Sequence, residues 1–101
     1  MLYPELMTPS EVAKHIAKCA KEKRLSLNMS QQSLAQRSGV SLGSLKKFEQ
    51  TGQISLASLL RLALVLGSLA DFVKVFAPKP PESFPTLNAL MKQKTRKRGR
   101  K

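Results

Sequence analysis

Residues 30–52 have the sequence SQQSLAQRSGVSLGSLKKFEQTG. Ser30 and Ser41 each stand before a short amphipathic segment, where a serine hydroxyl caps the free backbone N–H groups of a helix start. Gly39 lies between the two segments and suits the left-handed conformation that ends many helices. The stretch therefore predicts two short helices joined by a tight turn, over residues 31–38 and 42–50.

The apolar residues of this stretch predict how the two helices pack. Leu34 and Ala35 of the first helix are expected to meet apolar residues across the turn, namely Val40, Leu45 and Phe48. The opposite face of the second helix then points outward and consists of Ser41, Leu42, Gly43, Ser44, Lys46 and Lys47. A helix with such a face is suited to lie in the major groove of DNA.

Helix signals also precede this unit. Thr8-Pro9-Ser10-Glu11 has the pattern of a capping box with proline in the first helical position, and it predicts a helix that ends near Arg24. The expected apolar stripe of this helix consists of Val12, Ile16, Cys19 and Ala20. Residues 24–29 are then the expected connection to the next helix.

Two more helices are expected after residue 52. Ser55 caps a segment that runs through Leu66, and Gly67 ends it. Residues 69–77 have the apolar spacing of a fifth short helix, with Leu69, Phe72, Val73 and Phe76 on one face. Because no period-2 apolar pattern is present, the predicted fold class is all-α, with five helices in one compact domain.

The predicted organisation has three parts. Residues 1–7 are an N-terminal extension, residues 8–77 are the helical domain, and residues 78–101 are a Pro-rich linker and a flexible basic tail. One further short helix is expected at residues 86–92.

Charge is concentrated at the C-terminal end of the chain. The formal net charge is +12, from 18 Lys and Arg residues against six Asp and Glu residues. Residues 92–101 hold seven of the basic residues and no acidic residue, so the other 91 residues carry +5. A charge of this size predicts a polyanionic partner such as nucleic acid. The tail itself has three interpretations: non-specific DNA binding, folding on a protein partner, or a solubilising end.

Other classes of protein find little support. Cys19 is the only cysteine, so no intrachain disulfide is possible and a cytoplasmic, nucleoid-associated location fits. The start of the chain lacks the pattern of a signal peptide, and polar residues interrupt the apolar-rich stretch 54–76, so no membrane span is expected. No nucleophile–base set, metal-ligand spacing or phosphate loop is present, which predicts no enzyme activity, catalytic residues, metal or cofactor.

Several single residues have two interpretations. Cys19 is expected to be a buried core residue rather than a reactive thiol, and Glu49 is expected to be a buried acid paired with Arg37 rather than a catalytic group. Gly43 is either a tolerated helix glycine or a point where the backbone approaches DNA closely. The apolar face of residues 69–77 is expected to be core, or an interface for a second copy or another partner.

The ordered residues from Ser30 to Gly52, with the leucine-rich segment 54–67 that follows, resemble the Xre type, or lambda-repressor-like, helix-turn-helix family. The resemblance covers roughly residues 10–76 and implies a regulator that binds a double-stranded DNA operator. Matched to the family's pattern, the implied DNA-binding residues are Gln31, Gln32, Ser41, Leu42, Gly43, Ser44, Lys46, Lys47, Thr51 and Gln53.

The opening Leu6-Met7-Thr8-Pro9-Ser10 and the small size also resemble HipB-like antitoxins. That resemblance implies a homodimeric repressor of its own operon that also binds a HipA-like kinase toxin. The alternative is a stand-alone Xre-type phage or bacterial regulator without a toxin partner. General RNA binding is a further alternative, although the chain has few aromatic residues to stack on bases.

Overall fold

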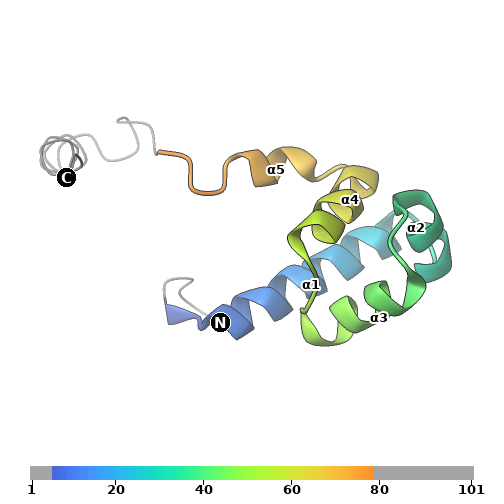
Figure 1. The fold of residues 1–101 in the computed structure, drawn as a ribbon, viewed down its shortest axis with the longest axis horizontal. Helices are drawn as coiled ribbons and strands as arrows, with labels where there is room; N and C mark the ends of the chain where they lie inside the picture. The colour runs from blue at the N-terminus through green and yellow to red at the C-terminus, as the bar shows by residue number, and fades with distance from the viewer. Residues whose placement is uncertain (1–5, 79–101) are drawn as a thin grey trace, which may run out of the picture.

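The computed structural model describes residues 6–78, which form the five helices shown in Figure 1. They are α1 (Pro9–Ser26), α2 (Gln31–Ser38), α3 (Leu42–Thr51), α4 (Leu56–Leu66) and α5 (Leu69–Val73). No β-strand occurs within residues 6–78. The fold class is therefore all-α, as the sequence predicts.

Each of the first four helices begins where a hydroxyl group satisfies a backbone N–H group. The Thr8 hydroxyl accepts a hydrogen bond from the N–H of Glu11, whose carboxylate accepts one from the N–H of Thr8. This reciprocal pair is the predicted capping box. In α2, α3 and α4 a serine accepts from the N–H three residues later: Ser30, Ser41 and Ser55. Local sequence thus determines all four helix starts.

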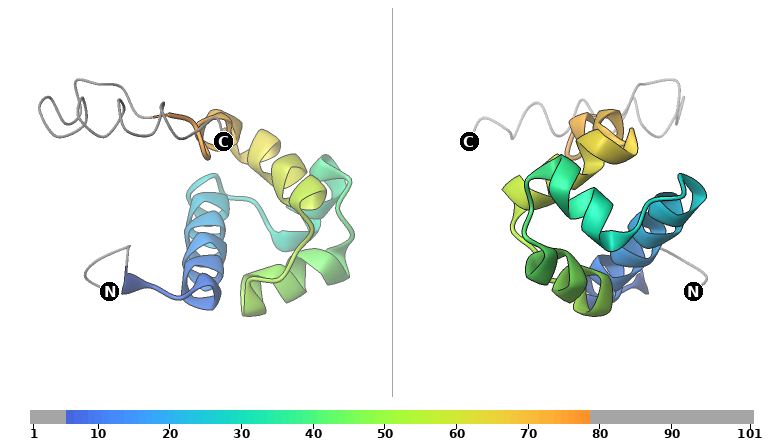
Figure 2. Two further views of the ribbon diagram at one scale, coloured as in Figure 1. Left: turned by 60° about the vertical axis from the view of Figure 1, so that its left-hand side comes forward. Right: turned by 90° about the vertical axis from the view of Figure 1, so that its right-hand side faces the viewer.

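One apolar core joins α1 to α4. Its largest fully buried side chains are Phe48, Leu34, Leu45 and Leu62, with smaller residues packed around them. Helix α1 packs on α3 and α4, while α2 packs on α3 and α4. The two views of Figure 2 show α2 and α3 next to each other, with α5 beyond α4. The helix pair 31–51 therefore rests on a common core.

The inward face of α1 differs from the predicted stripe. Cys19 is exposed rather than buried, and Val12 also lies mostly outside the core. The residues that are buried or half-buried along α1 are Ala13, Ile16, Ala17, Ala20 and Arg24. The observed stripe includes Ala13, Ala17 and Arg24, which the predicted stripe lacks, so the predicted stripe is rotated around the helix toward Val12 and Cys19.

The connection between α1 and α2 contributes to the core. Helix α1 continues to Ser26, two residues beyond its predicted end, and Met29 in the following loop is buried. Asn28 has a φ of +58°, a conformation that asparagine tolerates better than most residues. This turn brings Met29 under the helices instead of leaving the connection on the surface.

Helix α5 is shorter than predicted. It ends at Val73 rather than near Ala77, and Phe76 has a φ of +67°, which a continuing α-helix does not allow. Phe76 is fully exposed and Val73 is 78% exposed. Phe72 is half-buried and Leu69 is 36% exposed, so the part of the predicted apolar face formed by Val73 and Phe76 lies outside the core.

Some predictions concern residues 1–5 and 79–101, which lie outside the described part of the chain. They include the short helix at residues 86–92, the linker and the basic tail. The three-part division of the chain therefore stays a prediction. Among residues 6–78, no helix has both the length and the apolar character needed to cross a bilayer.

Two glycines that end helices differ in their surroundings. Gly39 and Gly52 both have left-handed backbones, with φ of +79° and +84°. A Cβ atom on Gly39 would meet nothing within 4 Å, whereas a Cβ atom on Gly52 would lie 2.8 Å from the carbonyl carbon of Ala13. The end of α3 therefore touches the backbone of α1 at a point that admits no side chain.

This difference predicts unequal costs for the same substitution. Gly39→Ala should lower the free energy of unfolding by about 1 kcal/mol, the cost of a left-handed alanine. Gly52→Ala should lower it by about 2 kcal/mol or more, because α1 must also move away. Urea unfolding followed by circular dichroism measures both. Equal losses in the two variants would contradict the close contact between α3 and α1.

Candidate nucleic-acid interface

Helices α2 and α3 form a tightly seated pair. Leu34 and Ala35 of α2 are buried together with residues from the turn and from α3: Val40, Leu45 and Phe48. These are the contacts that the sequence predicts across the turn. With its inner face held in this way, α3 presents its opposite face to solvent.

The structure places most of the candidate DNA-binding residues on this outer surface. Those that are exposed are Gln32, Ser41, Gly43, Ser44, Lys46, Lys47, Thr51 and Gln53. Gln31 and Leu42 are half-buried, and Leu42 packs against the core. Leu42 therefore has a structural role, and only part of its side chain is available to a ligand.

Three hydroxyl groups of this surface also serve the fold. Ser41 Oγ accepts from the Ser44 N–H at 3.1 Å and lies 2.9 Å from Ser44 Oγ. Thr51 Oγ1 donates to the Lys47 carbonyl at 2.7 Å and accepts from the Gln53 N–H at 3.1 Å. Their hydrogen-bonding capacity toward a ligand is reduced, so the two lysines are the strongest donors on the face of α3.

A shallow hollow lies beside these lysines, between α3 and the start of α4. Its volume is about 270 Å³, and it is lined by Ser44, Lys47, Gln53, Ile54, Ser55 and Ser58. The hollow combines a lysine ammonium, a glutamine amide and the N-terminus of an 11-residue helix. Each of these groups favours a phosphate oxygen.

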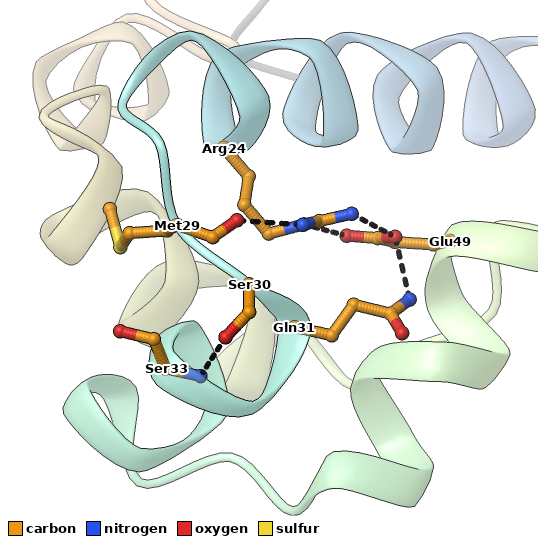
Figure 3. A network of polar contacts seen from close by, with 6 residues as sticks. All are labelled: Arg24, Met29, Ser30, Gln31, Ser33 and Glu49. Carbon is orange, nitrogen blue, oxygen red and sulfur yellow. Dashed lines mark hydrogen bonds and ion pairs between the residues drawn. The ribbon is translucent and has the colours of Figure 1, made fainter.

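A buried ion pair connects α3 to α1. The Arg24 guanidinium binds the Glu49 carboxylate in a bidentate manner, with Nε 2.9 Å from Oε2 and Nη2 3.1 Å from Oε1. The Arg24 and Glu49 side chains are only 7% and 4% exposed. Figure 3 shows this pair between the two helices. The geometry has the short, paired contacts that make such an interaction strong.

The same network includes the loop and α2. Arg24 Nη1 donates to the Met29 carbonyl at 2.8 Å, and Gln31 Nε2 donates to Glu49 Oε1 at 2.9 Å (Figure 3). The Glu49 carboxylate therefore accepts three hydrogen bonds, from α1 and from the first residue of α2. One acidic side chain of α3 is thus hydrogen-bonded to both α1 and α2.

The predicted partner of Glu49 is wrong. Arg37 is exposed, and the buried partner is Arg24. The prediction that Glu49 is a buried structural acid is confirmed. The sequence prediction placed Arg24 at the end of the first helix and gave it no partner, although its spacing of four from Ala20 and seven from Ala17 places it on the inward stripe. This spacing is the sequence feature from which the burial of Arg24 could have been predicted.

The network also affects Gln31. Its Nε2 group is held by Glu49, so the amide group of Gln31 is oriented before any ligand binds. Its neighbour Gln32 is exposed. Both residues lie in the first turn of α2, where free N–H groups favour an anion.

No cluster of three or more metal-binding side chains occurs within residues 6–78. His15 and Cys19 lie together on α1, with 3.5 Å between Nε2 and Sγ, away from α3.

Comparison with known proteins gives one finding. A protein-family model described as Helix-turn-helix matches residues 21–72, which is just over half of the chain and contains the whole of α2, α3 and α4. No curated protein matches the chain as a relative.

The network predicts a large effect of a small change at Glu49. Glu49→Gln should lower the free energy of unfolding by about 3 kcal/mol or more, because it leaves the Arg24 charge buried without its counter-charge. The double substitution Arg24→Met with Glu49→Leu should cost less than this single change, because it removes both charges. Urea unfolding of the two variants makes the comparison. A single variant no less stable than the double one would contradict this role of the pair.

Proposed function

Because the chain belongs to the helix-turn-helix family of DNA-binding transcription regulators, we propose that it is a sequence-specific repressor that places α3 in the major groove of its operator. The observation that carries this proposal is the exposed face of α3, with Lys46, Lys47 and Ser44, on a helix whose inner face is fixed by Leu45 and Phe48. Such a helix can present side chains to base edges without first being ordered.

Each part of the surface has a separate role in this proposal. Lys47 donates to O6 or N7 of a guanine, and the exposed part of Leu42 touches a thymine methyl group. Gln31 and Gln32 bind a backbone phosphate at the start of α2. Thr51 and Gln53 approach a second phosphate next to the hollow between α3 and α4. The phosphate contacts would set the position of α3, and the lysine and serine side chains would provide the sequence preference.

The charge distribution supports an anionic ligand at this surface. No acidic residue occurs between Arg24 and Glu49 in the sequence. The carboxylate of Glu49 is neutralised by its buried partner, so the face formed by α2 and α3 keeps the positive charges of Lys46 and Lys47. This arrangement attracts DNA, because no unneutralised carboxylate between Arg24 and Glu49 repels the phosphate groups.

We further propose that the repressor is a homodimer whose interface includes Leu69, Phe72, Val73 and Phe76. The exposure of Val73, Val75 and Phe76 supports this, because several large apolar side chains exposed within one short segment commonly mark an interface. A two-fold dimer would place two copies of α3 about one helical turn of DNA apart, roughly 34 Å.

The sequence likeness to HipB-like antitoxins supports a second partner, a HipA-like kinase toxin. In this proposal the repressor controls its own operon and neutralises the toxin. Co-purification with the product of an adjacent kinase-like gene tests it. If no such product binds, the stand-alone regulator is the better description.

The DNA-binding proposal predicts that Lys47 on α3 and Lys18 on α1 contribute differently to DNA affinity, although both carry one positive charge. Lys47→Ala should weaken binding to a duplex from the protein's own promoter by about 1–3 kcal/mol and have less effect on random DNA. Lys18→Ala on α1 is the matched control and should change both affinities little. Fluorescence anisotropy at fixed salt measures them. Equal loss on both duplexes would make Lys47 a phosphate contact, and absence of a footprint on the promoter would contradict the repressor.

The basic tail should contribute mainly to the salt dependence of binding. Ending the chain at residue 91 removes seven positive charges and should reduce the slope of log affinity against log salt by up to about 6. The preference for promoter over random DNA should change little. An unchanged slope would exclude a DNA-binding role for the tail.

The proposed dimer depends on exposed apolar side chains of α5 and the turn after it. Val73→Asp combined with Phe76→Asp should make the chain monomeric, because both would bury a carboxylate in the interface. Lys74→Asp adds the same acidic side chain at an already polar position and should leave the dimer intact. Sedimentation equilibrium distinguishes the two outcomes. A dimer that survives the double substitution would place the interface elsewhere.

A further inference from the structure

An apolar groove lies between α1, α4 and α5. Its volume is about 310 Å³, and no residue of α2 or α3 lines it. Ile16, Leu59, Leu62 and Phe72 provide apolar walls, and the exposed residues Cys19 and Lys23 also line the groove. The groove is therefore separate from the surface proposed to bind DNA, and it shares only Phe72 with the proposed dimer interface.

The groove is suited to a few apolar side chains. Its volume is at the lower end of the range typical of ligand-binding clefts, roughly 300–1,000 Å³. Ile16, Leu59 and Phe72 are only half-buried in the described structure. Covering them removes apolar surface from water, which is favourable by roughly 25 cal/mol for each Å².

We propose that residues 84–91 of the same chain, FPTLNALM, bind in this groove. The segment carries no charge, and its large apolar residues stand at positions 84, 87, 90 and 91. It is followed directly by the basic run that begins at Lys92. The apolar part of the C-terminal region is thus short and sharply bounded, as expected for a segment that fills a small groove.

The connectivity of the chain favours this occupant. Asp71 and Phe72 line the groove, and the described chain ends shortly afterwards at Pro78. The five residues 79–83 can span at most about 17 Å when extended. A tether this short keeps the segment at an effective concentration in the millimolar range next to the groove, so a weak apolar contact is enough to hold it.

The apolar character of the groove and its few charged residues also favour residues 84–91 over the basic run 92–101 as the occupant. Lys23 and Asp71 both lie among the lining residues. An uncharged segment enters between them without burying a charge. The basic run 92–101 is a poor occupant, because several cations would lose their hydration in an apolar groove that offers one carboxylate, Asp71. Docking of residues 84–91 therefore leaves the basic run in solvent, and withholds the apolar segment from other proteins until it is displaced.

The single cysteine provides a direct test on the full chain. Cys19 lies in the wall of the groove and is exposed when the groove is open, so the occupant should slow its reaction with N-ethylmaleimide, an uncharged thiol reagent. Leu87→Asp combined with Leu90→Asp should release the segment. If the segment is bound in about nine molecules of ten, the reaction of Cys19 should become about tenfold faster.

A matched variant controls for the added charge. Thr86→Asp combined with Asn88→Asp adds the same two carboxylates at polar positions and should react at the rate of the unsubstituted chain. Equal rates in all three chains would overturn the proposal, as would equal acceleration in both variants. A rate that falls with rising protein concentration would assign the groove to a second copy instead. All four substituted residues lie outside residues 6–78, and circular dichroism verifies that the helices are unchanged.

Discussion

The contact between Arg24 and Glu49 is the interaction on which the arrangement of the helices depends. It joins the end of α1 to the end of α3, and through Gln31 and the Met29 carbonyl it also holds the start of α2 and the loop before it. Burying two charges is costly, and here the cost is offset by three hydrogen bonds that Arg24 donates and three that Glu49 accepts. A change that disturbs one member of this network is therefore felt by all three helices at once.

This constraint explains how a small core can hold a binding surface rigidly. Leu45 and Phe48 fix the rotation of α3 about its own axis, while Glu49 and Gly52 fix its end against α1. The face with Lys46 and Lys47 is thus oriented by residues that do not point toward the ligand. Since the hydroxyl groups of Ser41, Ser44 and Thr51 on this face already take part in hydrogen bonds within the protein, we infer that affinity depends strongly on the lysines and on phosphate contacts at helix starts.

Local signals predicted most of the fold. Ser30, Ser41 and Ser55 act through hydrogen bonds to residues three positions away, and Gly39 acts through its own backbone, so sequence alone was sufficient for these helix ends. Cys19 was wrongly predicted to be buried, and the burial of Arg24 and Met29 was not predicted, because the surroundings of these residues come from parts of the chain distant in sequence. A charged residue on an inward stripe is ambiguous until its partner is known, and that partner, Glu49, is 25 residues away. The exposed candidates on α3 were placed correctly on the surface, but their contacts with DNA remain predictions.

The central claim is that DNA binds across the starts of α2 and α3. It is tested most directly by a ¹H–¹⁵N NMR titration of the full chain with a duplex from its own promoter. We expect the largest changes in chemical shift at the amides of residues 31–32, 41–47 and 51–53, with little change along the groove between α1, α4 and α5. Changes concentrated on α1 and α5, with the amides of α3 unaffected, would contradict the account.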